Sequence, residues 1–492
     1  MKFYSTRGGA SAANASEAIV KGIAEDGGLF VPERYPDLSR SLEEMLDMDY
    51  AERAAFVLSK FLEEYDYEEL LRACEEAYSR FDEDAAPVLK LDENLYILEL
   101  FHGPTLAFKD IALTLLPYLL RAGCDNAGIK DDVLILTATS GDTGKAALEG
   151  FKNKKGVKIM VFYPDEGVAE MQRLQMTTTE GENVSVVAVE GNFDDCQTAV
   201  KKIFTDEAFK KELKENGVIF SSANSMNFGR LSPQIAYYFS AYCDLVGAEE
   251  IKMGQKVDFV VPTGNFGDIL AGYYAKKMGL PVGKLICASN KNNVLTDFFE
   301  TGVYDVNREF FKTMSPSMDI LVSSNLERLI FDVENRDPEK TKAMMKSLSE
   351  KGRYEIDRAR VAHLSETFYA NFCAEEACAE TIGNFFEEYE YVLDPHTAVA
   401  MSVYDGYACE NGADRPAVIL STASPYKFPS DVYEAISGKY ESDPFVAAEK
   451  LEKESAVPVP EQIAALKSKR VRFMKKAKKD ELKEIVREFA LK

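Results

Sequence analysis

Short continuous runs of apolar residues alternate with helical patterns through most of this chain, and this alternation narrows the possible folds more than any other feature of the sequence. Each run is rich in β-branched residues and ends in a glycine-rich or polar turn. Such runs are typical of parallel strands covered by helices on both faces of a sheet. The clearest are D-V-L-I-L-T before Ala138, V-K-I-M-V-F-Y-P from Val157, V-S-V-V-A-V from Val184, V-D-F-V-V-P from Val257, L-I-C-A-S-N from Leu285 and A-V-I-L-S-T from Ala417. The sequence therefore predicts an α/β fold.

The chain is too long, at 492 residues, for one ordinary hydrophobic core, so we expect two or three domains. Residues 1–90 show helical patterns and predict a small helical N-terminal domain. Residues 91–438 carry the strands, with a helix-rich elaboration at about 300–390. Residues 439–492 predict an extension ending in a basic helix, with eleven basic and four acidic residues from Lys467 onward. This helix could be an anion-binding arm, but pairing with an acidic protein body is the favoured interpretation.

Charge and cysteine usage narrow the class of partner. The net charge of -24 opposes binding to nucleic acid or to anionic membranes, so we expect a small-molecule partner. Eight cysteines without a C-x-x-C pair indicate a reducing compartment, and the N-terminus lacks the apolar core of a signal peptide, so we expect a cytoplasmic protein. No apolar run is long enough to span a bilayer, and no H-E-x-x-H or similar motif predicts a metal site.

Three glycine-rich or polar turns follow predicted strands and precede helical patterns. They are T-A-T-S-G-D-T-G at 137–144, N-S-M-N-F-G-R at 224–230 and T-G-N-F-G-D at 263–268. Backbone N–H groups at such helix starts favour anions. The first turn is not a nucleotide P-loop, because Ala146 stands where a magnesium-binding Ser or Thr is required, and the third does not match G-x-G-x-x-G. Plain strand-to-helix turns, and a surface ion pair for Arg230, remain the alternatives.

One lysine, Lys109, lies in F-H-G-P-T-L-A-F-K-D directly after apolar residues. Desolvation lowers a lysine pKa and makes the amine a candidate nucleophile toward a carbonyl. By itself this lysine would more simply pair with Asp110 while its stem packs against Phe108. Two of the turns, however, could bind phosphate groups. With them, Lys109 would meet the two requirements of a pyridoxal phosphate site: an amine that condenses with the aldehyde and a binding site for the phosphate. The second anion site indicates a phosphorylated substrate.

Several long motifs in one order resemble the threonine synthase family, within the fold type II group of pyridoxal-phosphate enzymes. They cover nearly the whole chain up to about Gly438. The motifs are Y-S-T-R-G-G, D-G-G-L-F-V-P-E, H-G-P-T-L-A-F-K-D, T-A-T-S-G-D-T-G, N-S-M-N-F-G-R, T-G-N-F-G-D and L-S-T-A-S-P-Y-K-F. The resemblance implies two α/β lobes that form a catalytic region.

The resemblance also implies roles for individual residues. Lys109 would bind the cofactor aldehyde covalently and later move protons, Thr422 would hydrogen-bond the pyridine nitrogen, and Asp142 would lie near the ring hydroxyl. The cofactor phosphate cup would be formed by Gly264, Asn265, Phe266, Gly267 and Asp268. The candidates for binding the phosphate and carboxylate of the substrate are Thr139, Ser140, Thr143, Asn224, Ser225 and Arg230.

The implied reaction converts O-phospho-L-homoserine and water to L-threonine and phosphate. One departure from the family pattern is Ser424, which stands where a histidine commonly follows the threonine matching Thr422. Two alternatives stay open: a phospho-lyase that releases 2-oxobutyrate and ammonia, and a non-catalytic protein that binds phosphorylated metabolites. The sequence leaves the oligomeric state open between monomer and dimer.

Overall fold

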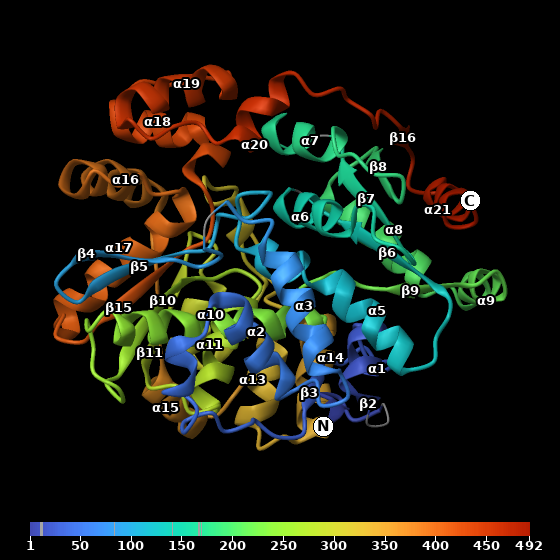
Figure 1. Cartoon of the computed structure of the whole chain (residues 1–492), viewed down its shortest axis with the longest axis horizontal. Coiled ribbons are helices and arrows are strands. Elements are labelled where there is room, and N and C mark those ends of the chain that lie inside the picture. The colour runs from blue at the N-terminus through green and yellow to red at the C-terminus, as the bar shows by residue number, and fades with distance from the viewer. Residues whose placement is uncertain (10–12, 83, 140, 166–167, 169) are drawn as a thin grey trace.

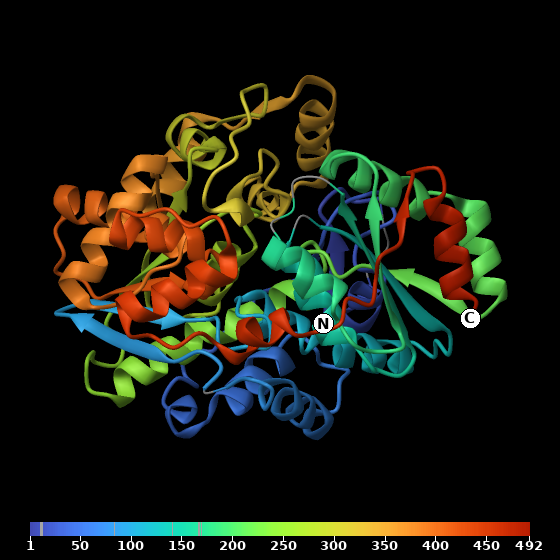
Figure 2. The same ribbon diagram turned by 90° about the horizontal axis from the view of Figure 1, so that it is seen from above.

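Two α/β lobes lie side by side in the computed structural model of the chain, as Figures 1 and 2 show from two directions. The structure describes residues 1–9, 13–82, 84–139, 141–165, 168 and 170–492. None of the helices within these residues combines the length and the apolar character needed to cross a bilayer.

The larger lobe is built on a six-stranded sheet in the order β14-β11-β10-β15-β5-β4, parallel except for the antiparallel edge strand β4. Alternate residues of β10 face opposite sides: Phe259 joins the cluster that includes α10 and α11, and Val260 joins the cluster that includes α17. Helices therefore cover both faces, which explains the continuous apolar runs. The elements are β4 (Val88–Asp92), β5 (Leu95–Glu99), β10 (Val257–Pro262), β11 (Val282–Ser289), β14 (Phe368–Phe372), β15 (Ala417–Ser421), α10 (Phe228–Gly247), α11 (Gly267–Lys277), α16 (Glu375–Tyr389) and α17 (Pro395–Asn411).

The smaller lobe is built on a fully parallel five-stranded sheet in the order β16-β8-β7-β6-β9. Its strands and helices are β6 (Asp132–Ala138), β7 (Val157–Pro164), β8 (Val184–Val189), β9 (Val218–Ser221), α6 (Asp142–Phe151), α7 (Glu170–Thr177), α8 (Phe193–Phe204) and α9 (Glu207–Glu215). Helices α4 (Lys109–Leu113) and α5 (Leu116–Asn126) connect the two sheets. The six predicted strands are all present, and the α/β prediction is confirmed.

The N-terminal residues are helical in large part but also form a small antiparallel sheet in the order β2-β1-β3. Phe3 of β1 lies edge-on to Phe228 of α10, with ring centroids 4.7 Å apart, so this region shares its core with the larger lobe. The elements are β1 (Lys2–Ser5), β2 (Ala13–Asn14), β3 (Phe30–Pro32), α1 (Ala15–Lys21), α2 (Tyr50–Ser59) and α3 (Tyr67–Tyr78).

The segment between β11 and β14 carries most of the helix-rich elaboration and also turns back toward the sheet edge. Its short 3-10 helix, Pro316–Met318, enters the region of Lys109, as described below. The other elements are α12 (Val294–Thr301), β12 (Val303–Asp305), α13 (Leu326–Val333), α14 (Pro338–Lys351), β13 (Arg353–Glu355) and α15 (Arg358–Thr367).

The C-terminal segment crosses from the larger lobe to the smaller one (Figures 1 and 2). Its elements are α18 (Pro429–Ser437), α19 (Pro444–Ser455), α20 (Glu461–Ala464), β16 (Lys476–Ala477) and α21 (Leu482–Ala490). The densest basic stretch, 468–479, is mostly extended rather than helical, because β16 adds to the sheet beside β8 and Arg472 donates to the carbonyls of Thr179 and Gly181. The basic residues do pair with acidic ones of the lobe, as in Lys483 with Asp206 and Arg487 with Glu212.

Candidate active site

Lys109 lies at the start of α4, just after the carboxyl end of β5, and its side chain is only 12% exposed. The backbone before it is bound to the segment after β15: Phe108 N donates to Thr422 O at 2.9 Å and Ser424 N donates to Leu106 O at 3.0 Å. Two stretches separated by about three hundred residues therefore meet, and Lys109 and Thr422 share one site. Ligands of open parallel sheets bind at this edge, outside the carboxyl ends of the strands.

A buried carboxylate, Asp142, is the acidic partner of this amine. Its Oδ2 lies 3.7 Å from Lys109 Nζ and accepts from Ser317 Oγ at 3.1 Å, and its Oδ1 lies 2.9 Å from Lys427 Nζ. Burial opposes ionisation of Asp142, but Lys427 and Lys109 outweigh it and hold the pKa of this carboxyl well below its usual range. The carboxylate of Asp110 instead accepts two hydrogen bonds from Thr105.

Ser317 lies between Lys109 and the third turn, 263–268, and contacts both. Lys109 Nζ donates to Ser317 Oγ at 3.4 Å, and a Cβ added at Gly264 would lie 2.9 Å from the Ser317 carbonyl oxygen. Phe266 precedes α11 in the left-handed conformation, with φ 62°, and its ring is buried. The turn thus places the N-terminus of an eleven-residue helix beside Lys109, and a larger residue at Gly264 would collide with backbone.

The Asp268 carboxylate is turned away from an anion-binding role. Its Oδ1 accepts hydrogen bonds from the hydroxyls of Tyr237 and Tyr238, which belong to α10. Burial raises the pKa of Asp268 to about 6, against the lowering effect of these two donors. Any contribution of Asp268 to phosphate binding would come from its backbone N–H.

The candidates for substrate binding lie at the starts of two other helices. Thr139 Oγ1 accepts from Gly141 N at 3.0 Å and Gly144 N at 3.1 Å, so this hydroxyl shapes its own turn, while Thr143 lies in the first turn of α6. Ser140 lies outside the described residues. Asn224 and Ser225 are partly buried before α10.

Arg230 is the buried cation among these candidates. Its Nη1 donates to Ala223 O at 2.6 Å, whereas its Nε is buried without a hydrogen-bond partner among the described residues. Burial lowers the pKa of Arg230 to about 10, so the guanidinium remains charged at neutral pH. A ligand that accepts a hydrogen bond from Arg230 Nε would stabilise this site, because a buried unpaired polar group costs about 1–3 kcal/mol.

The residues present fit pyridoxal phosphate and a second phosphate. The positive charges of Lys427 and Arg230 both act on Lys109 and help to lower its pKa, although burial is the largest cause. Three buried cations, Lys109, Lys427 and Arg230, therefore act near the carboxylates of Asp142 and Asp110, and bound phosphate groups would pair with these cations. Helix N-termini at α10 and α11 supply N–H donors for them.

A histidine that sequence reasoning missed, His396, supports the Ser317 turn. Its Nε2 accepts from Ser317 N at 3.2 Å, so Nδ1 carries the proton and donates to Asp394 Oδ1 at 2.8 Å. Asp394 is also the N-cap of α17 and accepts from the backbone N–H groups of His396 and Thr397. This capping role keeps its carboxylate buried beside the His396 ring. The signal available in the sequence was D-P-H-T, a helix-start pattern with proline at the first helical position. Ser317 and Lys427 were missed as well.

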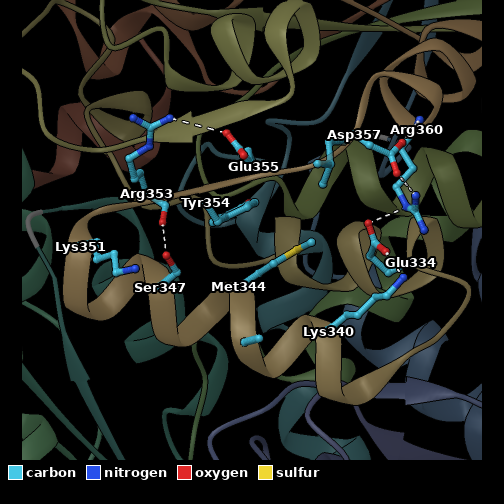
Figure 3. A pocket seen from close by; sticks show the side chains of 12 residues that line it. Glu334, Lys340, Met344, Ser347, Lys351, Arg353, Tyr354, Glu355, Asp357 and Arg360 are labelled. Atoms are coloured by element: carbon cyan, nitrogen blue, oxygen red, sulfur yellow. Dashed lines mark hydrogen bonds and ion pairs between the residues drawn. The ribbon is translucent and has the colours of Figure 1, made fainter.

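A separate pocket of about 740 Å³ lies between α14, β13 and the start of α15 (Figure 3). In Figure 3, Met344 and Tyr354 lie between charged groups at its two ends. Most of these charges pair with one another: Glu334 contacts Arg360 at 2.6 Å and Lys340 at 3.3 Å. None of the predicted site residues within the described ranges lines this pocket.

Comparisons with known proteins identify the family of the chain. Residues 2–78 match the family described as threonine synthase N terminus, residues 84–423 the pyridoxal-phosphate dependent enzymes, and residues 397–486 threonine synthase, C-terminal. The chain is 40% identical to threonine synthase of Pseudomonas aeruginosa over 95% of this chain and 97% of that one. It superimposes on the pyridoxal-phosphate-bound threonine synthase of Brucella melitensis with a TM-score of 0.88 and 36% identity, covering 100% and 99% of the two chains.

A human protein, threonine synthase-like 1, is 43% identical over 86% of this chain, and the chain spans only 58% of its length. The fold and the site define a pyridoxal-phosphate-dependent enzyme of fold type II. Within that class, the chain belongs to the threonine synthase family.

Proposed function

We propose that this chain converts O-phospho-L-homoserine and water to L-threonine and phosphate. The observation that carries the proposal is the nearly buried Lys109 amine, held beside the N-terminus of α11 and in a site with the buried cation Arg230. Family membership supports the same activity, because threonine synthases are 36–40% identical to the chain over most of its length.

Lys109, Thr422 and the turn at 263–268 are the residues we assign to the cofactor. The backbone N–H groups at the start of α11 would hold the phosphate, and Thr422 would hydrogen-bond the ring nitrogen as a neutral group. When bound, pyridoxal phosphate supplies an aldehyde that condenses with amines and a ring that delocalises the negative charge left by a departing α-proton. The ion pair of Asp142 and Lys427 would lie near the ring hydroxyl.

Proton transfer falls to Lys109. With cofactor and substrate bound, the free amine of Lys109 would be the base that takes the α-proton. Burial lowers the pKa of Lys109, which increases the fraction of neutral amine at physiological pH. Asp142 and Ser317, at 3.7 and 3.4 Å from Nζ, would orient the amine and accept its hydrogens when it becomes an ammonium.

Arg230 would bind the phosphate that leaves the substrate. Its unpartnered Nε points to a missing acceptor, and Asn224, Ser225 and Thr143 offer neutral donors at nearby helix starts. Charge that develops on the leaving group would be stabilised most by such fixed donors in a buried site. Water would then add at the β-carbon.

Product analysis tests this proposal. The purified chain, loaded with pyridoxal phosphate, should release phosphate and threonine in equal amounts from O-phospho-L-homoserine. Lys109→Ala should abolish turnover and the yellow absorbance of lysine-bound cofactor, whereas Lys130→Ala, at an exposed position, should preserve both. Release of 2-oxobutyrate and ammonia would establish the phospho-lyase alternative. A chain that binds cofactor but yields neither product would support the non-catalytic alternative.

We further propose a cytoplasmic location. All eight cysteines are unpaired, and seven of them are buried. Such usage is typical of reducing compartments.

A further inference from the structure

Asn325 lies behind the turn at 263–268 and is fully buried. The segment S-S-N at 323–325 is hydrogen-bonded to this turn. Ser323 Oγ donates to Gly264 O at 2.6 Å, and Asn325 N donates to Asn265 O at 3.1 Å. Asn325 immediately precedes α13, where an asparagine side chain usually accepts from the helix backbone. Here it makes no such capping bond.

The side-chain amide of Asn325 has one free end. Its Nδ2 is buried and has no hydrogen-bond partner within the described residues. The same atom lies 3.4 Å from the position that a Cβ would occupy at Gly267, the first residue of α11. An unpaired buried N–H costs about 1–3 kcal/mol, so an acceptor at this helix start would be bound with that gain.

Arg328 fixes which end of the amide faces the turn. Its Nη1 donates to Asn325 Oδ1, and an arginine side chain can only donate, so Nδ2 must be the end directed at Gly267. Arg328 is itself fully buried, and no carboxylate within the described part of the chain forms an ion pair with it. Its other bonds go to Phe30 O at 3.0 Å and Met226 O at 2.6 Å.

We propose that Asn325 donates a hydrogen bond from Nδ2 to the phosphate of the bound cofactor and that Arg328 is the positioning residue that orients this amide. The inference rests on the proposed cofactor site. Arg328 also places a buried positive charge behind the phosphate turn. Because it holds Met226 in the N-S-M-N-F-G-R turn as well, it links the turn assigned to the cofactor with the turn assigned to the substrate.

The test compares pyridoxal phosphate with pyridoxal, which lacks the phosphate. Both are titrated into the cofactor-stripped full chain, and binding is followed by absorbance. Asn325→Ala should weaken pyridoxal phosphate about 10- to 100-fold, as expected for one hydrogen bond to a charged group, and should leave pyridoxal unchanged. Asn325→Asp should weaken pyridoxal phosphate further, because a carboxylate would face the dianion. Arg328→Lys should lower the ratio of the affinity for pyridoxal phosphate to the affinity for pyridoxal, because a lysine cannot make the three hydrogen bonds of the guanidinium.

Asn183→Ala is the matched control, because the Asn183 amide donates to the carbonyls of Phe151 and Val157 and is satisfied by structure alone. It should leave the ratio of the two affinities unchanged even where it lowers the melting temperature. An unchanged ratio in Asn325→Ala would overturn the inference. A rise only in the KM for O-phospho-L-homoserine would also overturn it, by assigning Asn325 to the phosphate of the substrate. If the unmodified chain bound neither compound, the proposed function itself would fail.

Discussion

At the scale of single residues, Asp268 is a carboxyl group in the turn that we assign to the cofactor phosphate. Two tyrosine hydroxyls donate to Oδ1, while Oδ2 has no partner among the described residues. Burial raises the pKa of Asp268 to about 6, so the carboxyl is protonated more readily in the folded than in the unfolded state. Ionisation above that pH places a buried negative charge near the start of α11, which Lys109 and the two tyrosines offset only in part.

Asp268→Asn should therefore stabilise the protein at neutral pH but not at low pH. A carboxyl whose pKa is raised on folding contributes stability that is present below its unfolded pKa and is lost as the pH rises through its folded value. The asparagine keeps an acceptor for both tyrosines and has no charge to lose. Its advantage in urea unfolding should grow between pH 4 and pH 7.5 by on the order of 2 kcal/mol.

The control for this experiment is Asp480→Asn, which alters an exposed carboxylate. Its stability curve should run parallel to that of the unmodified chain. A parallel curve for Asp268→Asn would mean that Asp268 is ionised in the folded protein throughout this pH range.

At the scale of elements, helix α21 of the basic C-terminal segment packs on the smaller lobe through its apolar side. In α21, Leu482 and Val486 are fully buried and belong to the same cluster as Phe209 and Leu213 of α9. The charged pairs of this helix, such as Lys483 with Asp206, are partly exposed to solvent. Solvated ion pairs contribute little, whereas a buried leucine contributes through both transfer and packing.

Leu482→Ala should lower the free energy of unfolding of the smaller lobe by about 2–5 kcal/mol. Lys483→Gln on the same helix should change the urea midpoint only slightly, and the small change should vanish at high salt. Urea unfolding of both variants at low and high salt decides the matter. If Lys483→Gln were the more damaging change, charge would be what holds the helix to the lobe.

The same elements show what the sequence could and could not predict. Strands such as β6, β7 and β10 were predictable because burial on both faces leaves continuous apolar runs. The basic helix expected from Lys467 onward is wrong for 468–479, which is mostly extended, because pairing of β16 with β8 overrides local helical preference. Strand β14, which directly follows α15 and carries the polar residue Asn371, had no such run.

The residues of the candidate site also fall into a predictable group and a group that the sequence does not reveal. Lys109 and the glycine-rich turns carry local signals, since their chemistry depends on neighbouring residues in the chain. Ser317, His396 and Asn325 act through contacts with residues 50 to 200 positions away, as in the bond from Asn325 to Asn265. No local pattern reports such contacts.

At the scale of the whole molecule, the two lobes divide the proposed ligands between them. The turn at 263–268 and Thr422 follow strands of the larger sheet, whereas α6 and the turn before α10 follow strands of the smaller one. Lys109 lies at the connection between the sheets, where groups from both sides converge.

Amide hydrogen exchange should therefore separate two patterns of protection. Pyridoxal phosphate should slow exchange mainly in α4 and the first turn of α11, and O-phospho-L-homoserine added to the loaded Lys109→Ala variant should extend protection to α6 and the start of α10. Amides that exchange only through global unfolding should slow about 100-fold when free ligand is 100 times its dissociation constant. The pocket between α14 and β13 is an internal control, because most of its charges are already paired with one another and none of the proposed ligand-binding residues that the structure describes lines it. Protection confined to that pocket on adding substrate would place the substrate there, and the division between the lobes would then be wrong.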